Sequence, residues 1–158
     1  MLANADGSNP RRLASVGCCV DSIDWSPDGS TIVARVIDRE GGLVTQPDVY
    51  LALGVDGAER ARVKVPVGGA ERHVVWSPSG ERFLIPSEGS AFVVSLAGAG
   101  QLDLGANLVA AWSPDGTQMA VVERNGGPMR IVSAADGSLV RTLERPVPGY
   151  VGEVRWLP

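Results

Sequence analysis

The residues Trp25-Ser26-Pro27-Asp28-Gly29 form a short motif that recurs along the chain. Trp76-Ser77-Pro78-Ser79-Gly80 and Trp112-Ser113-Pro114-Asp115-Gly116 repeat it, and Trp156-Leu157-Pro158 matches its beginning. The tryptophans at positions 25, 76, 112 and 156 are therefore 51, 36 and 44 residues apart. Self-similarity at such a period is typical of a repeat protein, in which each copy forms one small unit of supersecondary structure.

Each copy of the motif has the composition of a tight turn between two strands. Pro presets φ for a type I turn, Asp accepts hydrogen bonds from nearby backbone N–H groups, and Gly adopts the left-handed conformation that closes the turn. Apolar stretches follow the turns, such as Ile32-Val33-Ala34 and Phe83-Leu84-Ile85. We therefore predict a β-hairpin at each motif, with a positive φ at Gly29 and at Gly116.

A second series of turns alternates with the first and divides each repeat into four short strands. These turns are expected at Asp6-Gly7, Asp56-Gly57, Gly98-Ala99-Gly100 and Asp136-Gly137. Four-stranded antiparallel meanders repeated at about 40 residues are typical of β-propeller blades, so we predict an all-β fold of this kind.

The repeat boundaries predict about three complete blades and a partial blade at either end. The complete blades are expected at residues 16–66, 67–104 and 105–146, the partial blade at 1–15, and the start of a further blade at 147–158. Strands are expected at about 1–5 and 10–15 in the partial blade and at about 150–157 in the last one. We expect the single region 1–158 to be a piece of a larger propeller.

The motif resembles the TolB-type propeller repeat, which also occurs in the propellers of prolyl-oligopeptidase-like peptidases. This chain departs from that repeat at Ser79, at Gly98-Ala99-Gly100 and at Leu157. The resemblance implies a non-catalytic binding or scaffold module for a protein or peptide partner, beside the remaining blades of its parent propeller. The alternative that it leaves open is the propeller segment of a prolyl-oligopeptidase-like or dipeptidyl-peptidase-like serine peptidase, which restricts substrate access.

The resemblance also implies a bacterial periplasmic or other extracytoplasmic location, although residues 1–7 do not have the pattern of a signal peptide. Composition agrees with a globular domain, because 44% of the residues are apolar, 20% are charged and the formal net charge is −4. No basic run is longer than Arg11-Arg12, so we expect no nucleic-acid partner. No apolar run is long enough for a membrane span.

The residues that carry chemistry in other proteins favour structural roles here. His73 is the only histidine, Cys18 and Cys19 are adjacent and poorly placed for a mutual disulfide, and there is no nucleophile elbow or phosphate-binding loop. We therefore expect no enzyme activity, no cofactor and no metal. We expect the tryptophans to pack between sheets and the turn aspartates to bind backbone N–H groups.

Basic residues occur on several of the expected fourth strands, where we expect them to protect the exposed sheet edge from pairing with other chains. They are Arg11, Arg12, Arg60, Arg62, Lys64, Arg141 and Arg145.

The more variable connections are expected on the side opposite to the tight turns, and loops on a rigid scaffold often carry binding residues. They cover about residues 37–47, 66–72, 87–90, 123–128 and 146–152. The side chains there that could recognise a protein or peptide partner are Arg39, Glu40, Arg72, His73, Arg124, Asn125 and Tyr150.

Overall fold

The computed structural model describes residues 1–15, 19–37, 39–40, 43–44, 48–65, 73–87, 89–98, 100–147 and 149–156. Within these residues the fold is all-β, without a helix, and consists of three four-stranded antiparallel sheets and a small two-stranded one. The described part of the chain accordingly contains no helix that could span a bilayer.

Each large sheet is a simple meander in which strands that follow one another in the sheet are neighbours. The first sheet consists of β1 (Cys19–Trp25), β2 (Thr31–Ile37), β5 (Asp48–Gly54) and β6 (Glu59–Val65). The second consists of β7 (Val75–Trp76), β8 (Arg82–Ile85), β9 (Ala91–Ser95) and β10 (Gln101–Gly105). The third consists of β11 (Leu108–Trp112), β12 (Gln118–Glu123), β13 (Gly127–Ser133) and β14 (Leu139–Val147).

The repeated motif forms the turn between the first two strands of each sheet, as predicted. The carbonyl of Ser26 accepts a hydrogen bond from the N–H of Gly29 at 2.9 Å, and its N–H donates to the carbonyl of Thr31 at 2.9 Å. The φ angles of Gly29 and Gly116 are 69° and 71°, which confirms the left-handed conformation. The buried hydroxyl of Ser26 also accepts a hydrogen bond from the N–H of Thr31 at 2.9 Å. This bond gives a direct physical reason for the distance between the motif serine and the start of the following strand.

The two series of turns lie together at one end of the sheets. In the first sheet the N–H of Val55 donates to the carbonyl of Ser30, and in the third sheet the N–H of Ala134 donates to the carbonyl of Thr117, both at 2.9 Å. The longer connections therefore emerge at the other end, where the sequence predicted them.

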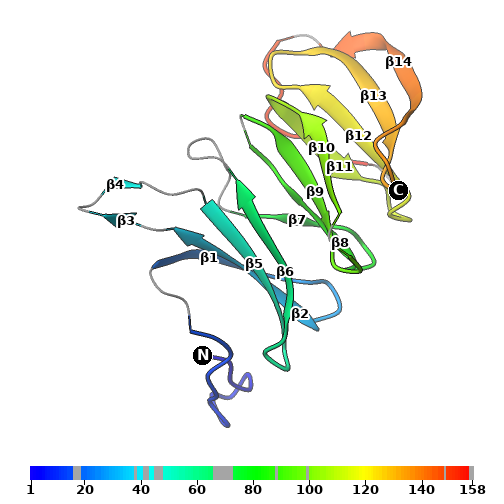
Figure 1. Cartoon of the computed structure of the whole chain (residues 1–158). Helices are drawn as coiled ribbons and strands as arrows, with labels where there is room; N and C mark the ends of the chain where they lie inside the picture. Colours follow the sequence, from blue (N-terminus) through cyan, green and yellow to red (C-terminus); the bar gives the residue numbers. More distant parts are fainter. Residues whose placement is uncertain are drawn as a thin grey trace.

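The three sheets stand side by side and pack face to face (Figure 1). The second sheet lies in the middle and packs against both of the others. It can do so because alternate side chains of a strand point to opposite faces. Phe83 and Ile85 pack into a core shared with the first sheet, while Leu84 and Val93 pack into a core shared with the third. This double burial explains why β8 is apolar almost throughout rather than alternating.

Irregular segments rather than sheets lie against parts of the two outer faces of the array. Residues 1–15 lie beside the first sheet, where the Arg11 guanidinium donates to the carbonyl of Val55. Residues 149–156 lie on the third sheet, where the indole of Trp156 donates to the carbonyl of Ala111 at 3.0 Å. Within residues 1–15 the segments expected to form strands at about 1–5 and 10–15 meet in an isolated antiparallel bridge between Leu2 and Arg11, with the expected turn at Asp6-Gly7 between them, but they form no full strands. Residues 150–156 form no strand, so the strand expected at about 150–157 is wrong over its described part.

Two further findings differ from the sequence-based expectations. The long connection after β2 contains a short hairpin of β3 (Arg39–Glu40) and β4 (Leu43–Val44), which the composition of that stretch did not indicate. The four tryptophans are also not equally buried: Trp112 is buried between sheets, whereas Trp25 is 48% exposed, because no sheet lies against its face of β1. The expectation that every Trp packs between sheets is therefore wrong for Trp25.

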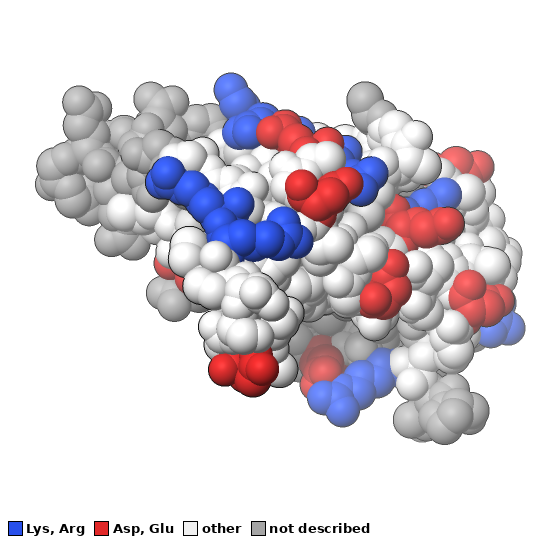
Figure 2. All heavy atoms as spheres, turned by 90° about the horizontal axis from the view of Figure 1, so that it is seen from below, with Lys and Arg blue, Asp and Glu red and all other residues white. Residues whose placement is uncertain are grey.

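Basic side chains do lie on the outermost strands. Arg60, Arg62 and Lys64 on β6 are exposed or half-exposed, and so is Arg141 on β14. On the face of the molecule seen from below, acidic and basic groups are interspersed, with no stripe of one sign (Figure 2).

Candidate functional site

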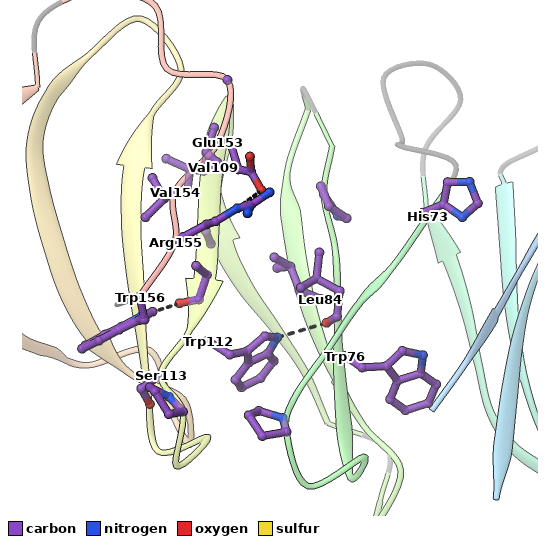
Figure 3. A pocket seen from close by; sticks show the side chains of 18 of the residues that line it. His73, Trp76, Leu84, Val109, Trp112, Ser113, Glu153, Val154, Arg155 and Trp156 are labelled. Atoms are coloured by element: carbon purple, nitrogen blue, oxygen red, sulfur yellow. Dashed lines mark hydrogen bonds and ion pairs between the residues drawn. The ribbon is translucent and has the colours of Figure 1, made fainter. Parts of the chain in front are cut away.

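A cavity of about 820 Å³ lies between the first strands of the second and third sheets and the segment 152–156. Its walls are mostly apolar and come from β7, β11 and their flanking residues (Figure 3). The apolar and aromatic wall residues are Val75, Trp76, Leu84, Leu108, Val109, Ala110, Ala111, Trp112, Val154 and Trp156. A concave apolar surface with a few polar groups at its rim is the usual form of a binding site.

The position of this cavity follows from the meander topology. Both β7 and β11 are the first strands of their sheets, so each has a neighbour in its own sheet on one edge and none on the other. The indole of Trp112 crosses from β11 to the second sheet and donates to the carbonyl of Val75 at 3.0 Å. Trp156 repeats this contact one unit further along, on the carbonyl of Ala111 (Figure 3). Two tryptophans thus fix the spacing of the walls.

The charged groups at the rim are His73, Arg124, Glu153 and Arg155. Nε of Arg155 pairs with Glu153 at 2.6 Å, and both side chains are exposed. The hydrogen bond and charge of Glu153 raise the pKa of Arg155. The guanidinium of Arg155 stays exposed at the rim although it pairs with Glu153, and an exposed guanidinium can also bind a carboxylate of a partner.

His73 is held at the rim by Asp24 of the first sheet. Its Nδ1 lies 2.8 Å from the carboxylate, which also accepts a hydrogen bond from the N–H of Val74 at 3.1 Å. The His73 side chain is 67% exposed. Asp24 is the one hydrogen-bond partner found for this ring in the described part of the chain, so His73 is not paired with a hydroxyl or thiol nucleophile there.

The hydroxyl in the cavity wall, that of Ser113, is part of the turn. It donates to a carboxylate oxygen of Asp115 at 2.6 Å and accepts from the N–H of Gln118 at 3.0 Å. Among the residues with a defined place, no group of three or more His, Cys, Asp and Glu side chains could hold a metal ion. The groups that surround the cavity are therefore suited to hydrogen bonding, ion pairing and apolar contact.

The predicted partner-binding residues are divided between this cavity and other places. His73 and Arg124 both line it, and the carbonyl of Arg124 accepts a hydrogen bond from Val151 N–H at 2.7 Å. Asn125 lies in the exposed turn after β12, and Tyr150 is 76% exposed beyond the cavity wall.

The remaining predicted residues lie away from this cavity or outside the described part of the chain. Arg39 and Glu40 form β3, away from the cavity, and Arg72 lies outside the described residues. The structure thus brings together two of the seven predicted residues, while the side chains of Asn125 and Tyr150 point to solvent nearby.

The sequence analysis missed the apolar part of the site. Val75 and Ala111 each precede a motif tryptophan, and Arg155 occupies the same position before Trp156. The repeat alignment already placed these residues in register, so the signal was present. It could not be interpreted from the sequence, because a strand edge that faces a cavity and one that faces a neighbouring sheet have the same apolar pattern.

A second charged cluster lies within the first sheet, away from the cavity. Arg35 on β2 pairs with Asp21 at 2.7 Å and with Asp48 at 2.8 Å, and so connects three neighbouring strands. Burial opposes the charge on Arg35, but the hydrogen bond and charge of Asp48 outweigh it and raise the pKa of the guanidinium. Because the three side chains are largely buried against one another, this cluster stabilises the sheet and offers no open site.

Comparison with known proteins bears on the fold alone. No protein-family model and no curated protein sequence matches the chain. Among solved structures, it is similar to Kuenenia stuttgartiensis hydrazine synthase, with a TM-score of 0.50 and 17% sequence identity over 85% of this chain and 36% of that one. The chain thus spans about a third of the length of that protein, and the likeness supports an all-β repeat architecture.

Proposed function

We propose that the three sheets are consecutive blades of a TolB-like β-propeller and that the chain is a non-catalytic binding module. Three four-stranded meanders in a row, packed face to face with their first strands on one side, support the propeller. The tight turns at one end and the longer connections at the other also fit this architecture.

The observation that carries the binding function is the cavity of about 820 Å³ with its apolar walls and the exposed Arg155 at its rim. Its partner is a protein or peptide segment that inserts an apolar side chain between β7 and β11. Burying one large apolar side chain contributes about 1.5–3 kcal/mol, which suffices for a moderate affinity when the walls are already in place. A carboxylate on the same segment pairs with the exposed guanidinium of Arg155 at the rim.

The test is selection of displayed random peptides on the immobilised chain, followed by affinity measurements on synthetic copies of the enriched sequences. We expect enrichment of peptides that combine a large apolar residue with a nearby Asp or Glu. Val75→Arg should weaken their binding more than tenfold (about 1.4 kcal/mol), because it places a charge against the apolar wall. Val75 is 40% exposed, so this change leaves the sheets folded.

Leu139→Lys is the matched control, because it introduces a charge at an exposed apolar position of β14, away from the cavity. It should leave the affinity unchanged. If no peptide is enriched, or if the enriched peptides bind the Val75→Arg variant as tightly as the original chain, the proposed function is wrong.

A further inference from the structure

The motif tryptophan and the residue two positions before it face the preceding sheet in the second and third repeats. Trp112 is 8% exposed because it packs into the core shared with the second sheet, and Val74 is 8% exposed because it packs into the core shared with the first. In the first repeat the same two positions are Ile23 and Trp25, which are 56% and 48% exposed. The surface of β1 thus has the composition of a sheet-to-sheet interface but no sheet against it.

The register of β1 places these residues on one face. Ile23 pairs with Ala34 and Trp25 pairs with Ile32 on β2, and residues paired across two strands share a face. Their face is the one opposite to Val33, which packs against the second sheet. The bare surface is therefore the outer face of the first sheet, on the side of its first strand.

Two of the tryptophan indoles, those of Trp112 and Trp156, form a series of equivalent hydrogen bonds to the preceding repeat, whereas the buried indole nitrogen of Trp76 has no hydrogen-bond partner among the described residues. Trp112 donates to the carbonyl of Val75, and Trp156 donates to the carbonyl of Ala111, both at 3.0 Å. In each case the acceptor is the residue just before the tryptophan of the preceding repeat. No hydrogen bond of the Trp25 indole is found within the described residues. The series therefore predicts a backbone carbonyl opposite Trp25.

The two outer segments of the chain cover different halves of the faces on which they lie. Residues 1–15 contact the first sheet at its β5–β6 turn, where Arg11 donates to the carbonyl of Val55 and the carbonyl of Leu13 lies next to Gly57. Residues 149–156 cover the first strand of the third sheet through Trp156. The half that is bare on the first sheet is thus equivalent to the half that residues 149–156 cover on the third.

We propose that the Ile23–Trp25 surface is a head-to-tail interface with a second copy of this chain. The segment 149–156 of the second copy lies against it, and the Trp25 indole donates to the carbonyl of Arg155 in that copy. Arg155 is the next acceptor in the series, since it precedes Trp156 as Val75 precedes Trp76. The contact continues the two interfaces that the chain already contains, and a heterologous contact of this kind closes into a ring when its rotation allows.

A second copy fits this surface because the segments 1–15 and 149–156 of one chain lie on complementary halves of a sheet face. The head of one copy contributes residues 1–15 and the tail of the next contributes residues 149–156, so that together they fill the space that a whole sheet fills elsewhere. Exposed apolar patches of this kind on a folded chain mark association sites.

The test is light scattering coupled to size-exclusion chromatography at several protein concentrations, with circular dichroism to verify folding. We expect a defined oligomer, whose mass is a whole multiple of 16.5 kDa. Ile23→Lys on the head and Arg155→Glu on the tail should each give a folded monomer. An equimolar mixture of these two variants should form a dimer, because each retains the surface that the other lacks. Leu139→Lys, an exposed apolar position outside both surfaces, should retain the oligomer.

Trp25→Phe tests the hydrogen bond without a new charge, and it should shift the dissociation midpoint to at least several-fold higher protein concentration. A monomer at every concentration would overturn the proposal, and so would an oligomer that survives Ile23→Lys. Failure of the mixture to form a dimer would also contradict a head-to-tail contact. Light scattering measures the oligomer without any peptide, and Ile23 and Trp25 do not line the cavity, so the two proposals can fail separately.

Discussion

Between the first and second sheets a carboxylate crosses the gap, whereas an indole and a guanidinium cross between the second and third. Asp24 binds His73 and the N–H of Val74 in the first interface. In the second interface Trp112 donates to the carbonyl of Val75, as described above. The repeats are therefore alike in sequence but not in the polar contacts that join them.

The guanidinium of the second interface is that of Arg82, whose Nη1 donates to the carbonyl of Ala134 at 2.6 Å. It connects the second strand of the second sheet to the end of β13 in the third. Together with Trp112, it places one polar contact at the first strands and another near the turns. The second interface is thus held at two separate levels.

Trp76 of the first interface shows that one repeat position can contribute differently to the two interfaces. Trp76 packs on Phe83 with ring centroids 5.3 Å apart and an interplanar angle of 57°, but its buried indole nitrogen has no hydrogen-bond partner among the residues that the structure describes. By the register of the repeat, its acceptor would be the carbonyl of Asp24, the residue before Trp25. The same residue type at the same repeat position therefore contributes apolar packing alone in one interface, and packing plus a hydrogen bond in the other.

The largest effect is expected from removing the aromatic ring at the centre of the first interface. Phe83 is fully buried and contacts Trp76, so Phe83→Ala should reduce the free energy of unfolding by about 3–5 kcal/mol. Met119→Ala is the matched change in the second interface, where the side chain is also fully buried but smaller and more adaptable. We expect Met119→Ala to reduce the free energy of unfolding by less than Phe83→Ala does, and urea denaturation of both variants measures the difference. Equal or reversed losses would contradict a first interface that depends mainly on aromatic packing.

A smaller effect should separate the buried Trp112 from the partly buried Trp76. Trp112→Phe removes the donor to the carbonyl of Val75 and should cost about 1 kcal/mol or more beyond the loss of ring area. Trp76→Phe removes a buried donor that has no partner, so the release of that unpaired group should offset much of the lost packing. The comparison is made by chemical denaturation under identical conditions. A larger loss for Trp76→Phe would show that its indole does find an acceptor.

The smallest effect is on thermal stability at low pH, and it comes from Asp28 in the turn between β1 and β2. Hydrogen bonds from the Ser26 and Ser30 hydroxyls and the Ser30 N–H lower the pKa of Asp28 from 3.8 to about 2. A lowered pKa in the folded state means that this stabilisation is complete above pH 3.8 and is lost as the pH falls toward 2. The Asp28→Asn variant should therefore show a shallower loss of thermal stability over this range.

The corresponding turn of the second sheet, which lies at the second interface, is the natural control for this acid effect. Ser79 stands there in place of the aspartate, so that turn has no carboxylate to titrate. An Asp28→Asn variant whose melting temperature falls with pH as steeply as that of the original chain would exclude a contribution of Asp28 to acid sensitivity.

Much of the local structure could be predicted from the repeated motif because its rules act over a few residues. The φ preference of Pro27, the left-handed Gly29 and the Ser26 hydroxyl that binds the following strand depend on near neighbours in the chain. The prediction was less successful for residues 1–5, 10–15 and 150–156, which contain similar apolar and turn residues but lie in none of the four-stranded sheets. A strand needs a neighbouring strand to accept its hydrogen bonds, and that neighbour is not a property of the segment itself.

The sequence by itself therefore determined the all-β class, the positions of the turns and the meander order of the three sheets. The tertiary structure alone decided which tryptophan is buried, which carbonyl each indole reaches and which loop residues face the cavity. His73 and Asp24 are 49 residues apart and meet only because the first two sheets pack face to face. Burial and polar pairing depend on what the neighbouring sheet presents, and identical repeat positions acquire different neighbours as the sheets stack.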